Sequence, residues 1–166
     1  MLVRIFFICF LVLNSCVNTD KTFTFFGGQI INPETNYVIL FEKEIPIDTI
    51  YLDTNNRFLT KIKNKEEGLF YFKHGNEQQY IYLEPKDSLL IRLNTWNFDE
   101  TLVFSGKGAE RNNLLIDSFL ESEKERKIFY EYYDLPPSEF STKVAQVEKI
   151  KLDRYNNYIK SHPEES

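Results

Sequence analysis

The residues that could form covalent bonds or bind a metal are few and lie far apart. The two cysteines, Cys9 and Cys16, both fall within the first sixteen residues. The rest of the chain therefore has no disulfide and no thiolate nucleophile. The two histidines, His74 and His162, have no second histidine or cysteine at the spacing of metal ligands. We expect neither thiol chemistry nor a zinc site in this part of the chain.

A phosphate site is the next candidate, at Gly106-Lys107-Gly108. These residues lie between a predicted strand and a predicted helix, where backbone amides can bind an anion. The spacing does not fit the P-loop, and Arg111 stands where the dinucleotide fingerprint needs its third glycine. We therefore expect a flexible strand-to-helix turn rather than a phosphate site.

The acidic residues and serines also lack a catalytic pattern. Asp53, Asn55 and Asn56 superficially suggest a calcium loop, but the glycine and terminal glutamate of the EF-hand are missing, and turn chemistry explains them. Adjacent carboxylates occur at Glu66-Glu67, Asp99-Glu100 and Glu164-Glu165, but neighbours in sequence point in different directions. Ser88, Ser105 and Ser138 lack a G-x-S-x-G elbow. We predict that the chain is not an enzyme, has no catalytic residues and binds no metal or cofactor.

Tyrosines could bind a ligand without doing chemistry. Tyr80 and Tyr82 share one face of a predicted strand, while Ile81 and Leu83 share the other. If the tyrosine face is uncovered, Tyr80 and Tyr82 form a ligand platform that stacks on sugars or peptide side chains. The alternative is that a second sheet covers one face and helices cover the other, since aromatic residues dominate cores as well as interfaces.

Two kinds of element position these residues. Between residues 22 and 108, short runs of alternating character are separated by turn residues such as Ile45-Pro46, which predicts an antiparallel β-sandwich of about seven or eight strands. The expected strands are 22–31, 37–43, 47–52, 58–62, 69–73, 79–83, 89–94 and 101–105.

After Gly108 the apolar period becomes helical. One helix is predicted over 109–133, and a second begins after Ser138 as N-cap and runs to about residue 160. Residues 109–166 should therefore form a helical region, an α-hairpin appended to a mainly β domain. The second helix has an apolar stripe that we interpret as a partner contact: Phe140, Val144, Val147, Tyr155 and Tyr158.

The first fifteen residues have the layout of a secretory signal peptide. A basic start at Arg4 leads into nine apolar residues, Ile5 to Leu13, which as a helix span only about 14 Å. Leu13-Asn14-Ser15-Cys16 resembles the lipobox of bacterial lipoproteins, which implies that Cys16 is acylated and anchors the chain in a membrane. The alternative is an ordinary cleaved signal with a chance cysteine.

The lipobox resemblance also implies a location. Val17 follows the cysteine in place of an aspartate, so by analogy with Gram-negative lipoproteins we expect the cell envelope and its outer membrane, on the periplasmic side rather than the cell surface. Residues 16–21 would be a tether to the sandwich.

The formal net charge of the chain is −5, and the sequence has no basic stripe. This charge argues against nucleic-acid binding.

Several segments together resemble one family, the N-terminal β-domain of lipoproteins similar to TlpA-type thiol–disulfide oxidoreductases. The segments are Gly28-Gln29-Ile30-Ile31-Asn32, Asp48-Thr49-Ile50-Tyr51-Leu52-Asp53, Asn56-Arg57-Phe58, Tyr82-Leu83-Glu84-Pro85-Lys86-Asp87-Ser88-Leu89 and Phe104-Ser105-Gly106-Lys107-Gly108-Ala109-Glu110-Arg111-Asn112-Asn113. In that family a thioredoxin-like domain with a Cys-x-x-Cys pair follows the helices. This chain stops at Ser166 and has no cysteine after Cys16, so no catalytic residue of the family carries over.

The resemblance implies a non-catalytic accessory domain that is either truncated before its thioredoxin domain or encoded separately from it. Its expected role is positioning, homodimerisation or docking of a thioredoxin-like partner. The alternative is a surface or periplasmic lipoprotein that binds glycan or peptide through Tyr80 and Tyr82.

Overall fold

The structure is a computed structural model that describes residues 23–63 and 66–163. The predicted signal peptide, the lipidation site Cys16 and the tether lie outside the described residues. The strands are β1 (Thr24–Ile31), β2 (Tyr37–Glu42), β3 (Ile45–Tyr51), β4 (Arg57–Ile62), β5 (Gly68–His74), β6 (Glu77–Leu83), β7 (Ser88–Asn94) and β8 (Val103–Lys107). The helices are η1 (Thr95–Asn97), α1 (Phe98–Thr101), α2 (Ala109–Tyr132) and α3 (Pro137–Ser161).

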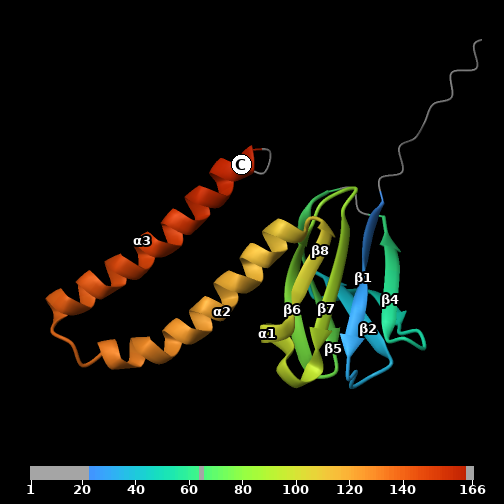
Figure 1. Cartoon of the computed structure of the whole chain (residues 1–166), viewed down its shortest axis with the longest axis horizontal. Coiled ribbons are helices and arrows are strands. Elements are labelled where there is room, and N and C mark those ends of the chain that lie inside the picture. Colours follow the sequence, from blue (N-terminus) through green and yellow to red (C-terminus); the bar gives the residue numbers. More distant parts are fainter. Residues whose placement is uncertain (1–22, 64–65, 164–166) are drawn as a thin grey trace, which may run out of the picture.

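The eight strands form two four-stranded sheets packed face to face (Figure 1). Sheet A has the order β4-β1-β7-β8, and sheet B has the order β3-β2-β5-β6. All pairs are antiparallel except β1 with β7, which run parallel with Phe26 opposite Leu89. The first strand therefore lies inside sheet A, between two strands that come much later in the sequence.

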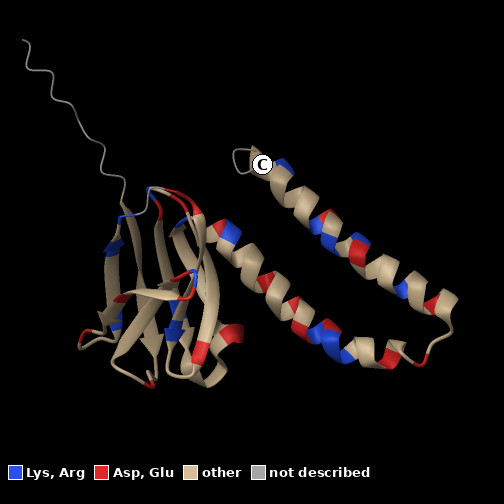
Figure 2. Ribbon diagram, turned by 180° about the vertical axis from the view of Figure 1, so that it is seen from behind, with Lys and Arg blue, Asp and Glu red and all other residues tan. Residues whose placement is uncertain are grey.

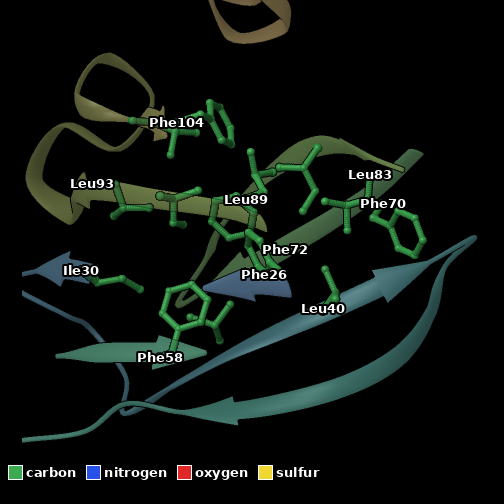
Figure 3. Close-up of a cluster of buried hydrophobic side chains, with 14 of the residues drawn as sticks. Phe26, Ile30, Leu40, Phe58, Phe70, Phe72, Leu83, Leu89, Leu93 and Phe104 are labelled. Carbon is green, nitrogen blue, oxygen red and sulfur yellow. The ribbon is translucent and has the colours of Figure 1, made fainter. Parts of the chain in front are cut away.

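The core lies between the sheets because inward residues alternate with outward ones along each strand. On β7, for example, Leu89, Ile91 and Leu93 are buried. The Phe26 ring packs against the rings of Phe58 and Phe72, with centroid distances of 5.5 and 5.6 Å (Figure 3). The fold class expected from the sequence, a β-sandwich followed by helices, is confirmed.

Helix α2 leaves the sandwich soon after it begins, and α3 starts at the far end of the arm (Figure 1). Only the first part of α2 is buried, through Ala109, Asn112 and Ile116. No α3 residue is buried. With 24 and 25 residues, the two helices are each about 36 Å long and form an arm that projects away from the sheets (Figure 1).

Polar contacts join the two helices of the arm near its middle. The Lys151 Nζ lies 2.6 Å from a Glu125 carboxylate oxygen, and a guanidinium nitrogen of Arg154 lies 2.7 Å from a Glu121 carboxylate oxygen. Near the tip, the ring of Phe140 stacks on Tyr133 at a centroid distance of 6.4 Å. No helix in residues 23–63 and 66–163 combines the length and apolarity needed to cross a bilayer.

Two local predictions are wrong. Ile45-Pro46 is not a break but the start of β3, where proline is tolerated because β3 is an edge strand and Pro46 lies next to a bulge at Leu40/Phe41. Ser138 is not the N-cap of α3, which begins one residue earlier at Pro137. Proline suits the first helical position because its missing N–H would be unsatisfied there anyway.

Candidate functional site

The first turn of α2 holds the edges of both sheets. The Asn112 side chain accepts a hydrogen bond from the Tyr82 backbone N–H at 2.7 Å and donates to the Tyr82 carbonyl at 2.8 Å. The next residue, Asn113, does the same for Phe104 at 3.0 and 3.3 Å. Since β6 and β8 are the edge strands on this side, two consecutive amides satisfy backbone groups that edge strands leave open.

A buried ion pair lies beside this turn. The Asp87 carboxylate is fully buried, bonds the Arg111 guanidinium and accepts the Glu84 backbone N–H at 2.8 Å. Glu84 itself lies 3.5 Å from Arg111. The Leu-Glu-Pro-Lys-Asp-Ser turn between β6 and β7 is thus linked directly to the start of α2.

Gly108 is required by this arrangement. Its φ is +93°, and a Cβ atom there would lie 2.7 Å from the Asp87 carboxylate and 2.9 Å from the Arg111 guanidinium. A side chain at position 108 would therefore collide with the Asp87–Arg111 pair. Gly106 and Lys107 end β8, and Gly108 links β8 to α2, which agrees with the strand-to-helix turn expected from the sequence.

Between β6 and the arm lies a cleft of about 560 Å³, which we call the hairpin cleft. Its lining comes from sheet B, from α2 and from the C-terminal end of α3: Glu67, Leu69, Tyr82, Glu84, Arg111, Leu114, Leu115, Tyr155, Tyr158 and Ile159. It brings together Tyr82 from the predicted ligand platform with Tyr155 and Tyr158 from the predicted partner stripe. A polar contact between the His162 ring and the Glu110 carboxylate joins the two ends of the arm near the cleft.

Tyr82 is the half-buried centre of the hairpin cleft. The Arg111 guanidinium lies over its ring, 5.7 Å from the centroid. Burial, followed by the charge of Glu67 and the hydrogen bond to its carboxylate, raises the pKa of the Tyr82 hydroxyl above its usual value. The hydroxyl is therefore a neutral hydrogen-bond donor at physiological pH.

Tyr80 has different surroundings, although it lies on the same face of β6. It is 43% exposed and packs edge-on against Tyr71, which in turn stacks on Phe41 at 4.6 Å. Burial and a hydrogen bond to Glu44 raise the pKa of the Tyr71 hydroxyl. The predicted platform is thus divided between an aromatic row on sheet B, in which Tyr80 is exposed, and the hairpin cleft.

The predicted partner stripe is also divided. Phe140, Val144, Val147 and Tyr158 are half-buried, whereas Tyr155 is 56% exposed. Phe140, Val144 and Val147 lie on the helical face that also carries Lys151, which bonds α2. Much of the stripe is therefore occupied within the arm, and the exposed apolar residues of α3 are Ile150, Leu152 and Tyr155.

Other polar residues have structural roles, of which the sequence analysis identified only that of Asp53. His74 is 1% exposed; its Nε2 accepts the Glu34 N–H at 3.0 Å, and its Nδ1 donates to the Tyr37 carbonyl at 2.9 Å. The Asp53 carboxylate accepts the backbone N–H groups of Asn55 and Arg57, both at 2.8 Å, which fits the predicted turn chemistry. Burial raises the pKa of Asp99, and its hydrogen bond from Gln79 opposes that rise.

The described residues contain no group of three or more His, Cys, Asp or Glu side chains placed to hold a metal ion. Comparisons with protein-family models, with curated proteins and with solved structures each found no match.

Proposed function

We propose that the chain is a lipid-anchored, non-catalytic accessory domain of the bacterial cell envelope that docks a thioredoxin-like partner through its helical arm. The anchoring half rests on the lipobox-like Leu13-Asn14-Ser15-Cys16. The docking half rests on one observation: a long arm is fixed firmly at its base while α3 buries no residue.

The polar residues with the strongest contacts support a structural rather than a catalytic role. Asp87, Arg111, Asn112 and Asn113 hold the turn and the sheet edges through hydrogen bonds and an ion pair. Along the arm, acidic and basic side chains are mixed on both helices (Figure 2). Exposed apolar side chains lie among them, including Ile150 and Leu152, each 58% exposed. Apolar contacts surrounded by charges are typical of non-obligate protein interfaces.

Site-specific photocrosslinking in intact cells tests the docking. A photoreactive amino acid replaces Leu152 on the arm in one variant, and Ile45 on sheet B, which is 65% exposed, in the matched control. The proposal expects a crosslink from position 152 to a protein with a Cys-x-x-Cys thioredoxin-like domain, and none from position 45. Identical products from both positions would overturn it, and an unmodified Cys16 in envelope fractions would overturn the anchoring.

A second candidate function is supported by the hairpin cleft. Tyrosine rings beside an arginine and two glutamates offer stacking and hydrogen bonds to a sugar or a peptide. A binding module of this kind predicts that Tyr82→Ala abolishes retention on a glycan or peptide array, whereas Tyr130→Ala on the arm, where the ring is 69% exposed, leaves it unchanged. Equal retention of both variants would remove this candidate.

A further inference from the structure

A second hollow, of about 620 Å³, lies on the outer face of sheet A, away from the arm. We call it the arginine hollow, because Arg57 on β4 and Arg92 on β7 flank Gln29 on β1 in one row across the sheet. Residues paired in this way share a face of the sheet, so both guanidinium groups belong to the same surface. The arginine hollow and the hairpin cleft share no lining residue.

The two arginines differ from the other arginines that the structure describes. Arg111, Arg126 and Arg154 each form an ion pair with a glutamate or an aspartate. Within residues 23–63 and 66–163, no carboxylate lies within 4.0 Å of the guanidinium of Arg57 or Arg92, and both residues are exposed. Two positive charges therefore face the same hollow without an ion-pair partner in the described chain.

The walls of the hollow are apolar. Leu59 and Leu90 are 61% and 41% exposed, and the Tyr51 ring, 67% exposed, lies at the rim. Between the two leucines, β1 has Gly27, where a Cβ atom would lie 2.6 Å from the Phe58 carbonyl oxygen and 2.8 Å from Leu59. The glycine lets Leu59 lie close over β1, so apolar surface continues across the strand up to the polar row.

The charge of the hollow indicates what fits. Asp53 also lines it, but that carboxylate already accepts two backbone N–H groups from its own turn. Two arginines and one aspartate leave a net charge of +1, which matches a single negative charge. Strands lie about 4.8 Å apart, so the two arginines, two strands apart, are about 10 Å apart at the backbone. Their long side chains can converge on one carboxylate, whose two oxygens suit the guanidinium fork.

We infer that the arginine hollow binds a monocarboxylate whose apolar substituent rests on Leu59 and Leu90. Such a group occurs at the C-terminus of a peptide that ends in an apolar residue, and also in a free apolar carboxylic acid. The inference does not depend on the arm or on membrane anchoring, so its failure leaves the proposed function untouched.

The test is a titration of the full chain, purified in detergent, with N-acetyl-L-leucine, followed by backbone amide NMR. Saturable shifts are expected at Gly28, Gln29 and Arg92. Arg57→Gln and Arg92→Gln should each weaken binding by about tenfold or more, since each removes a charged hydrogen-bonding partner. Arg126→Gln, on the exposed face of the arm, is the matched control and should leave binding unchanged.

Three further probes separate the parts of the inference. N-acetyl-L-leucinamide, which has no charge, should bind at least tenfold more weakly, and acetate, which has no apolar substituent, should also bind more weakly. A peptide that ends in a free leucine carboxylate is compared with octanoate. Tighter binding of the peptide would identify the ligand as a peptide C-terminus, and tighter binding of octanoate would identify it as a free apolar carboxylic acid. Equal binding of the amide, or unchanged binding by Arg92→Gln, would overturn the inference. Equal binding of acetate would overturn the part assigned to Leu59 and Leu90.

Discussion

Two arginine–carboxylate pairs hold the helical arm, and they differ in their exposure to water. At the base, the Arg111 side chain is 11% exposed and its partner Asp87 is 0% exposed. Along the arm, the side chains of Arg154 and Glu121 are 39% and 29% exposed. The same chemistry therefore has two consequences: the pair at the base cannot lose one member without leaving a buried charge, whereas the pair on the arm can be replaced by water.

The largest effect is expected from Asp87→Ala. It removes the partner of Arg111 and the acceptor of the Glu84 N–H, so the free energy of unfolding should fall by about 3 kcal/mol or more. Urea denaturation of the full chain measures this. Asp117→Ala, at an exposed position on α2, should change stability by less than about 0.5 kcal/mol. A loss below about 1 kcal/mol for Asp87→Ala would show that the base is no more firmly held than the arm.

An intermediate effect is expected from the two asparagines of the base. Asn112→Ala leaves the Tyr82 backbone N–H and carbonyl without their side-chain partner at a fully buried position, which should cost about 2–3 kcal/mol. Asn113 is only half-buried, so water can replace its side chain, and Asn113→Ala should cost about 1 kcal/mol. Chemical denaturation of both variants checks the order, and the reverse order would contradict the role given to burial.

The smallest effect is expected from Arg154→Gln on the arm. Exposed ion pairs contribute about 0–1 kcal/mol, so the global unfolding midpoint should stay nearly constant. Hydrogen exchange should instead accelerate locally in α3, because this helix has no buried residue to hold it. Global destabilisation comparable to that of Asp87→Ala would mean that the arm and the sandwich unfold as one unit.

The elements of the fold could be predicted from the sequence, but their partition between sheets could not. Alternation such as that of Leu89 to Leu93 is a local property, and it predicts all eight strands. The parallel pairing of β1 with β7 depends on packing between residues more than sixty positions apart, which no local pattern encodes. Glycine spacing likewise argued against a P-loop and a dinucleotide fingerprint, because the requirement for each glycine in these motifs is local.

The roles of individual polar side chains were mostly missed. Asn112 and Asn113 stand at the start of a helix, although asparagine is a poor helix former. Asparagines at such a position indicate that their side chains form hydrogen bonds to backbone groups, which is the signal that could have identified them. His74 gave no such signal, since its two backbone partners, Glu34 before β2 and Tyr37 at the start of β2, lie about forty residues earlier in the chain. The arginine hollow was missed because its three central residues lie on three separate strands.

The position of β1 also determines how the sandwich resists a pull on its N-terminal side. A force applied ahead of Thr24 acts along a strand that is hydrogen-bonded on both sides, to β4 and to β7. Such a load must shear two ladders at once, whereas an edge strand could be peeled away one bond at a time. The domain should therefore withstand tension from this end better than a sandwich whose first strand lies at the margin of its sheet.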